Sequence, residues 1–231
     1  MDWLKTALDF FLHLDKHLEE MIKTYQNWTY AILFGIIFVE TGVVIMPFLP
    51  GDSLLFAAGV FSGPGKPLSL GLVFALLSAA AVLGDTVNYW IGKYGGQAVL
   101  NSRLRRFIKQ QHLDRTHAFF EKYGGKTIVI ARFVPIVRTF APFVAGIGAM
   151  TYRKFLVYNI FGGVLWVAIC LFAGYFFGEQ PFVKKNFELV VLAIIAISIM
   201  PAVYEYFRHR AEIRAELRAE AKSEPPTQAG G

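Results

Sequence analysis

Long apolar runs, some of them interrupted by prolines and charged residues, constrain this chain more than any other feature of its sequence. Residues 68–92, 153–178 and 187–207 are apolar stretches, and a helix needs about 20 consecutive apolar residues to cross a bilayer. Residues 28–62 and 127–150 are similarly apolar but contain prolines and charged side chains. We therefore expect an all-α, polytopic membrane protein with about three full spans.

The composition supports a membrane protein and excludes other classes. Hydrophobic residues make up 55% and charged residues 17% of the chain, whereas soluble domains have about 45–50% and about 25%. The net charge of +6 could indicate a nucleic-acid partner. We exclude that partner because the basic residues cluster beside hydrophobic segments, where they set topology and contact membrane phospholipids. The single cysteine, Cys170, excludes an intramolecular disulfide, and we expect no metal or cofactor.

The two interrupted segments are expected to be re-entrant helical hairpins. Irregular backbone inside a membrane survives only where protein or a water-filled cavity shields it. In residues 28–62 two half-helices should meet near residues 47–51, and in residues 127–150 the turn should lie between Pro135 and Pro142. The residues expected to break the two hairpins are Pro47, Pro50, Gly51, Pro135, Pro142 and Gly146.

The remaining segments are expected at the membrane surfaces, around a membrane domain of residues 28–207. Residues 1–27 are typical of an amphipathic interfacial helix, with a helix packed on another part of the protein as the alternative. Residues 93–126 form a connector with eight basic and two acidic residues, which predicts a cytoplasmic position. Residues 208–231 are predicted to be a charged cytoplasmic tail. The N-terminal helix then lies on the outer face, unless residues 28–46 span the membrane and the N-terminus is cytoplasmic.

The two hairpins also repeat each other. With an offset of 95 residues, residues 38–51 align without a gap on residues 133–146, and five of 14 positions are identical. Chance similarity between apolar segments is the alternative. A true repeat would place the two units in opposite orientations, since the span at 68–92 lies between them. Inverted repeats with broken helices near the midplane are typical of secondary transporters.

Five ionisable residues lie inside the apolar segments. Each costs about 2.5–3.5 kcal/mol at the centre of a membrane helix, or on the order of 12–18 kcal/mol for five unpaired groups. The simplest solution brings the acids of the first hairpin against the arginines of the second. A purely structural ion pair is the alternative, but it accounts for only two of the groups. The five residues are Glu40, Asp52, Asp85, Arg132 and Arg138.

The types of charge suggest different roles. Arg132 and Arg138 suit the binding of a phosphate, with Arg138 in the expected turn as the best ligand and Arg132 pairing with Glu40 or Asp52. The carboxylates of Glu40, Asp52 and Asp85 could exchange protons in a low-dielectric site. Asp52 could instead cap the following half-helix, and Asp85 could reach the membrane interface.

Enzymatic functions are not favoured by the sequence. All five histidines lie outside the apolar segments, which argues against a membrane phosphatase with a histidine nucleophile and against a buried Ser/His hydrolase. No helical zinc motif and no phosphate-cradling glycine loop with lysine occurs in the sequence. The histidines are His13, His17, His112, His117 and His209.

Taken together, several motifs resemble those of the DedA family, the bacterial members of the wider VTT-domain (SNARE-associated) membrane proteins. The resemblance covers about residues 28–180. The motifs are Phe38-Val39-Glu40, Phe48-Leu49-Pro50-Gly51-Asp52, Gly84-Asp85 with Tyr89 and Gly92-Lys93, and Arg132-Phe133-Val134-Pro135 with Arg138 and Ala145-Gly146.

The resemblance implies two facing re-entrant hairpins and transport of lipid carriers, notably the recycling of undecaprenyl phosphate in the cell envelope. It also implies dependence on the proton gradient and a link to resistance against cationic peptides. The acids and arginines important in the family fall on Glu40, Asp52, Arg132 and Arg138.

The function expected from the sequence is a flippase for a phosphate-bearing lipid in the bacterial cytoplasmic membrane, with a polyprenyl phosphate as its partner. Three alternatives remain at this point: a proton- or cation-coupled exchanger of small solutes, a general phospholipid scramblase, and a membrane-organising protein without transport activity. The sequence predicts no oligomeric state.

Overall fold

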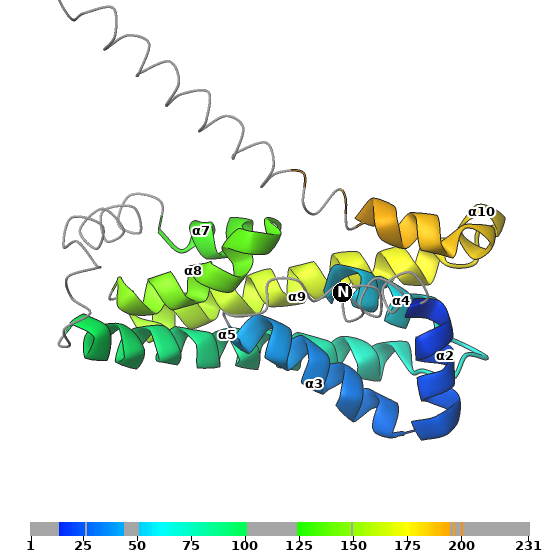
Figure 1. Ribbon diagram of the computed structural model, residues 1–231, viewed down its shortest axis with the longest axis horizontal. Coiled ribbons are helices and arrows are strands. Elements are labelled where there is room, and N and C mark those ends of the chain that lie inside the picture. The colour runs from blue at the N-terminus through cyan, green and yellow to red at the C-terminus, as the bar shows by residue number, and fades with distance from the viewer. Residues whose placement is uncertain are drawn as a thin grey trace, which may run out of the picture.

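The computed structural model describes residues 14–25, 27–43, 51–100, 124–148, 150–194, 196 and 200 (Figure 1). In these ranges the regular elements are helices, apart from an isolated bridge between Ser62 and Leu68, which confirms the expected all-α class. The helices are α2 (Leu14–Tyr25), α3 (Trp28–Gly42), α4 (Gly51–Val60), α5 (Leu70–Leu100), α7 (Lys126–Ala131), α8 (Pro135–Ile147), α9 (Tyr152–Phe177) and α10 (Pro181–Lys185).

Helices α5 and α9 form the frame of the protein and pack side by side along its long axis (Figure 1). Their segments Leu70–Gly95 and Tyr152–Phe177 are each 26 residues long and apolar enough to cross a membrane, and at 1.5 Å per residue each extends about 39 Å. They correspond to the predicted spans at residues 68–92 and 153–178.

Helix α5 continues to Leu100, beyond the predicted start of the connector at residue 93. Side-chain contacts one turn apart support the helix at its continuation, and the cytoplasmic position of the connector remains a prediction. The rings of Trp90 and Tyr94 stack with their centroids 5.3 Å apart, and the Lys93 ammonium lies 4.9 Å from the Trp90 ring centroid.

The first interrupted segment forms α3 and α4, with Val43 extended directly after α3. Helix α3 has 15 residues and is therefore about 22 Å long, which is shorter than the hydrocarbon core of about 30 Å. The alternative with a full span over residues 28–46 is therefore disfavoured. Helix α4 begins at Gly51, while Pro47 and Pro50 lie outside the described residues.

The second interrupted segment breaks at residues 132–134, before the predicted position. Val134 is extended, with φ −118° and ψ 106°, because the residue before a proline avoids the helical conformation. Pro135 then begins α8, where its missing N–H costs no hydrogen bond.

The prediction that Pro142 breaks this hairpin was wrong, and Arg138 lies in a helix instead of a turn. Helix α8 continues through Pro142 to Ile147. A proline inside a helix removes one backbone hydrogen bond, and neighbouring helices in membrane proteins can compensate. The carbonyl that loses its donor is that of Arg138. Helix α8 packs along α5 here, and Asn88 Nδ2 donates to the adjacent carbonyl oxygen, that of Thr139, at 2.7 Å.

The helices pack as two similar units. The first unit consists of the short helices α3 and α4 and the long helix α5, and the second consists of α7, α8 and α9. In each unit the first short helix, or first arm, packs against the long helix of the same unit: α3 on α5 and α7 on α9. The second arm packs against the long helix of the other unit, α4 on α9 and α8 on α5. Figure 1 shows α7 and α8 over one half of the frame and α3 and α4 over the other. This exchange supports an internal repeat, while re-entry from opposite membrane faces remains a prediction.

Glycines allow the close contact between α4 and α9. An added Cβ at Gly59 would lie 2.0 Å from the carbonyl oxygen of Leu171, and one at Gly174 would lie 1.9 Å from the carbonyl oxygen of Phe56. Both distances are far below van der Waals contact, so larger residues would force the helices apart. Small residues at such positions are typical of helix pairs in membranes.

The contact between α5 and α8 has the same construction. A Cβ at Gly92 would lie 2.1 Å from the carbonyl oxygen of Phe143, and one at Gly146 would lie 2.2 Å from that of Tyr89. Gly146 is thus a packing residue inside α8, and its predicted role as a hairpin breaker was wrong. Phe143 and Gly146 on α8 correspond to Phe56 and Gly59 on α4. The second arms of the two units are therefore offset by 87 residues rather than 95.

The predicted surface segments are described only in part. Helix α2 lies within residues 1–27 and packs on α3 and α4, with Leu18 buried in the main apolar core. Residues 187–194 are helical, as the third predicted span requires. The remainder of that span, most of the connector at 93–126 and the tail at 208–231 lie outside the described residues, and their positions remain predictions.

Candidate functional site

A first cluster of charged residues lies where α3, α4 and α8 meet beside α9. It consists of Glu40 from the last turn of α3, Asp52 from the first turn of α4 and Arg138 from the first turns of α8. Arg138 Nη1 donates to Asp52 Oδ1 at 2.8 Å, and Nη2 donates to Glu40 Oε1. Glu40 and Arg138 are 1% and 9% exposed. The predicted meeting of first-hairpin acids with a second-hairpin arginine is therefore present.

The carboxylate of Glu40 also contacts the N-terminus of α4. The backbone N–H of Gly51 donates to Glu40 Oε1 at 3.1 Å. A Cβ at Gly51 would lie 1.9 Å from Glu40 Oε2, so only glycine leaves room for the carboxylate. Helix N-termini favour anions because their N–H groups are free and their dipole is positive there. Glu40 therefore occupies a small anion site made by α4 and Arg138.

One oxygen of this carboxylate is not used. Glu40 Oε2 is buried and has no hydrogen-bond partner among the residues that the structure describes. Buried polar atoms normally have partners, and one without a partner calls for a functional explanation. Asp52, in contrast, is the second residue of α4, and its Oδ1 accepts hydrogen bonds from Arg138 and from Trp166 Nε1 at 2.7 Å.

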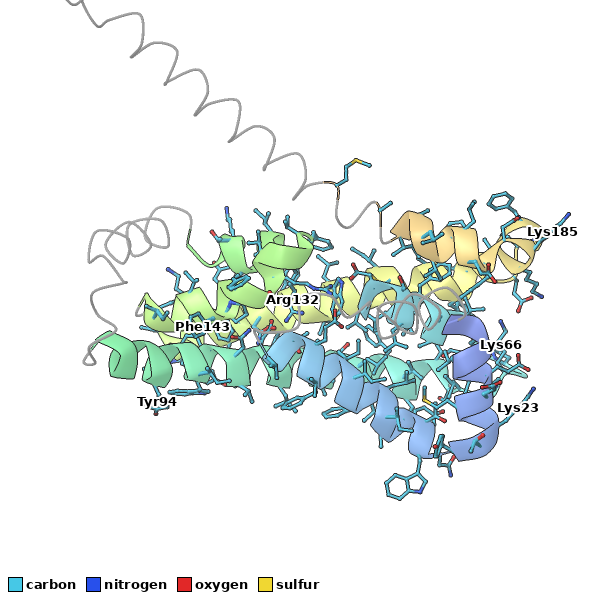
Figure 2. All side chains as sticks on the ribbon, viewed as in Figure 1. Lys23, Lys66, Tyr94, Arg132, Phe143 and Lys185 are labelled. Atoms are coloured by element: carbon cyan, nitrogen blue, oxygen red, sulfur yellow. The ribbon has the colours of Figure 1, made fainter. Side chains whose placement is uncertain are left out.

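A second cluster consists of Asp85 on α5, Arg132 directly after α7 and Asn159 on α9. Arg132 Nη2 donates to Asp85 Oδ2 and, at 2.6 Å, to Asn159 Oδ1. Asn159 Nδ2 in turn donates to the carbonyl oxygen of Val82 at 3.0 Å. All three cluster residues are buried within the protein, and the depth of Asp85 in the membrane remains a prediction. Figure 2 places Arg132 in the middle of the bundle, between Tyr94 and Lys185 near opposite ends.

The expected pairing of Arg132 with Glu40 or Asp52 was also wrong. Because the helix breaks at residues 132–134, Arg132 stays with α7 and faces α5 and α9 rather than the first hairpin. A glycine makes this possible, since a Cβ at Gly163 would lie 3.2 Å from Arg132 Nη2.

Three site residues were not predicted from the sequence: Asn88, Asn159 and Trp166. Asn88 Nδ2 donates to the carbonyl oxygens of Thr41 at 3.2 Å and Thr139 at 2.7 Å, and so joins α3, α5 and α8. Polar side chains inside apolar spans are expensive and usually functional. Two sequence signals could have identified these residues. The asparagines are polar residues inside apolar spans, and the tryptophan lies in the middle of a span, far from its usual interfacial position.

Comparisons with known proteins identify a matching family and several relatives. The family model described as the VTT domain matches residues 49–176. The chain is 50% identical over 211 residues to Protein DedA of Escherichia coli strain K12, covering 91% of this chain and 96% of that protein.

Other relatives are more distant. An uncharacterised membrane protein of Mycobacterium tuberculosis strain H37Rv is 47% identical over 177 residues, which cover 75% of this chain and 78% of the relative. The inner membrane protein YqjA of E. coli strain K12 is 31% identical over 175 residues, which cover 76% and 79%. No solved structure matches the chain. With a VTT domain over more than half its length and relatives of this similarity, the chain belongs to the DedA family of membrane proteins.

Proposed function

We propose that the protein transports a phosphate-bearing lipid across the bacterial inner membrane, with undecaprenyl phosphate as the substrate and the proton gradient as a driving force. The observation that carries the proposal is the position of Glu40. Its buried carboxylate accepts hydrogen bonds from Arg138 and from the first N–H of α4, between the two arms of a broken helix. A relative of the chain is named an inner membrane protein, which supports the location.

Glu40 acts as an internal substitute for the phosphate. The groups that hold its carboxylate are a guanidinium and a helix N-terminus, and both are preferred phosphate-binding groups. A phosphate can therefore bind where the carboxylate now lies, provided that the carboxylate leaves. Arg138 is the main ligand in this scheme. Arg132 is paired with Asp85 in the second cluster and has a supporting role beside the phosphate site.

Protonation of Glu40 would favour the departure of its carboxyl group from this site. Two carboxylates face one guanidinium in the first cluster, which leaves an excess negative charge in a low-dielectric environment. A proton on the unused Oε2 of Glu40 would remove that excess and weaken the attraction to Arg138. Phosphate binding and proton uptake are therefore coupled, and proton release returns Glu40 to the site after the lipid has left.

The lipid tail does not need to enter the protein. Three exposed apolar side chains lie near the break: Phe133 just before α8, and Val137 and Phe140 on α8, which also carries Arg138. These side chains are 42%, 45% and 42% exposed. An isoprenoid chain can lie against these side chains and remain in the bilayer while the phosphate moves through the interior.

The test is a flipping assay with purified protein in proteoliposomes, which compares undecaprenyl phosphate with an ordinary phospholipid. We expect movement of undecaprenyl phosphate by the unsubstituted protein and loss of movement in Arg138→Ala and Glu40→Gln. The matched control is Arg153→Ala, since Arg153 is exposed on α9. Full activity of both site variants would refute the proposal, and equal movement of the phospholipid would indicate a general scramblase.

The excess of carboxylates also favours a second candidate, an exchanger of small cations or solutes coupled to protons. The site offers two acids for one guanidinium, which suits a cation or a proton as cargo. Solute flux in vesicles that lack polyprenyl lipids would support this candidate over the lipid transporter.

A further inference from the structure

Trp166, in the middle of α9, contacts both buried charge clusters. Its ring centroid lies 5.0 Å from Cζ of Arg138 and 5.9 Å from Cζ of Arg132. Its indole Nε1–H donates to Asp52 Oδ1 at 2.7 Å. The side chain is 2% exposed. One residue thus touches the two arginines and one of the acids, from a helix that contributes no charge to the first cluster.

The two parts of this side chain act differently. The ring face attracts a guanidinium through its quadrupole, most strongly where water is excluded. This attraction does not depend on the carboxylates, so it persists when Glu40 takes up a proton or moves away. The N–H group holds Asp52 by a hydrogen bond to a charged acceptor, which is stronger than a neutral one.

We propose that Trp166 is a positioning residue that keeps Arg138 directed at the N-terminus of α4 during the exchange of Glu40 for a phosphate. Its N–H group restrains Asp52, so that Asp52 does not follow Arg138 and compete with the phosphate. The same ring also contacts Arg132, and this contact couples the exchange at Glu40 to the second cluster. The inference rests on the proposed function and deepens it.

Two variants separate the ring from the N–H group. Trp166→Phe keeps an aromatic face but removes the indole hydrogen bond to Asp52, and we expect a rise in KM for undecaprenyl phosphate of about tenfold, the size of one lost hydrogen bond to a charged group. Trp166→Leu removes both contacts, and we expect a fall in kcat/KM of about a hundredfold. The matched control is Trp90→Leu, which removes a stacked tryptophan with its own cation contact outside the site.

A spectroscopic measurement checks the contact without transport. The sequence contains four tryptophans, so substitution of Trp3, Trp28 and Trp90 by phenylalanine leaves Trp166 as the sole tryptophan reporter. We expect its fluorescence to change when undecaprenyl phosphate is added in nanodiscs, but not when undecaprenol is added, because only the phosphate displaces Glu40.

The outcomes distinguish the two proposals. An unchanged KM in both Trp166 variants, with normal transport, would overturn the inference and leave the proposed function intact. An unchanged fluorescence on addition of a lipid that is nevertheless transported would overturn it as well. Absence of transport by the unsubstituted protein would overturn the proposed function and this inference together. A loss of folded protein alone would lower the amount of active protein but leave KM unchanged.

Discussion

The two charged clusters each contain one arginine but differ in the balance of their charges. In the second cluster one guanidinium faces one carboxylate and one amide, all of them buried, and Arg132 Nε has no partner among the described residues. In the first cluster one guanidinium faces two carboxylates, and Glu40 keeps an oxygen without a partner among the described residues. A balanced cluster is suited to holding helices together, and an unbalanced one is suited to exchanging a proton or a ligand.

The neighbouring backbone strengthens this difference. Gly51 places the start of α4 against Glu40, so the first cluster includes a helix N-terminus that favours anions. The second cluster joins α5, the end of α7 and α9 through side chains. Buried ion pairs contribute little net stability, but removal of one partner leaves a costly unpaired charge. Removal of a charge should therefore mainly reduce stability in the second cluster and mainly reduce transport in the first.

The largest expected effect on stability is that of Asp85→Ala. It leaves the buried Arg132 without its carboxylate, and we expect a loss of about 3–5 kcal/mol in the free energy of unfolding. Denaturant unfolding in detergent micelles measures this loss. Glu20→Ala on the exposed face of α2 is the control and should change stability little. A small effect of Asp85→Ala would mean that the second cluster does not hold the helices.

Replacement of the whole pair sharpens the comparison. In the double variant Asp85→Leu with Arg132→Met both charges are absent, and such replacements are often neutral for stability. We expect folding close to that of the unsubstituted protein and transport that is retained at least in part. If transport is lost from a folded double variant, Asp85 or Arg132 takes part in transport, as the sequence had suggested for both.

Gly51→Ala should have an intermediate effect. The added Cβ would overlap the Glu40 carboxylate at 1.9 Å, so Glu40 loses the N–H group of residue 51. We expect a loss of about 1–3 kcal/mol, the cost of an unsatisfied buried group. Gly35→Ala is the matched control on α3, because a Cβ there meets nothing within 4 Å. Equal stability of the two variants would show that the contact between α4 and Glu40 is unimportant.

Glu40→Gln should change stability by only about 1 kcal/mol, since the amide oxygen can still accept from Gly51. Its effect on function should be large, because glutamine cannot exchange a proton. We expect any residual transport to become independent of the proton gradient, measured in proteoliposomes with and without an imposed pH difference. Glu20→Gln is the control. Gradient-dependent transport by Glu40→Gln would contradict the assignment.

The smallest effect is expected at the surface, where Glu179 follows α9. Hydrogen bonds from Lys184 and Lys66 lower the pKa of Glu179 to about 2. Because the folded pKa lies below the ordinary value of 4.5, its stabilisation is fully present above that value and is lost as pH falls through about 2. Thermal unfolding of Glu179→Gln should therefore show a small deficit at pH 6 that disappears near pH 2. A deficit that does not depend on pH would refute this ion pair.

Much of the fold followed from the sequence, and the errors have identifiable physical causes. Charged residues in apolar runs correctly predicted broken helices and a contact between acids of the first hairpin and an arginine of the second, although the arginine is Arg138 rather than Arg132. The partner of Arg132 depended on where the second hairpin breaks. The extended Val134 before Pro135 fixes that position, whereas the sequence contains a second proline, Pro142, that is equally able to break a helix.

The register of the repeat and the polar partners could not be predicted, because they depend on contacts between helices. Two segments of the first unit, beginning at Phe48 and Phe56, both have a glycine three residues later. Only the packing of Gly59 against α9 identifies the second as the equivalent of Phe143. The contacts of Trp166 likewise come from α4, from α8 and from the residue after α7, and leave no local pattern in the sequence.

The most direct test of the account is the number of protons taken up when undecaprenyl phosphate binds to the protein in nanodiscs. Calorimetry in buffers of different ionisation enthalpy gives this number, at a pH well above the second pKa of a phosphate, which is about 6. If the phosphate displaces Glu40, binding should be accompanied by uptake of about one proton in the unsubstituted protein and by none in Glu40→Gln. Binding without proton uptake, or equal uptake in both proteins, would contradict the central claim.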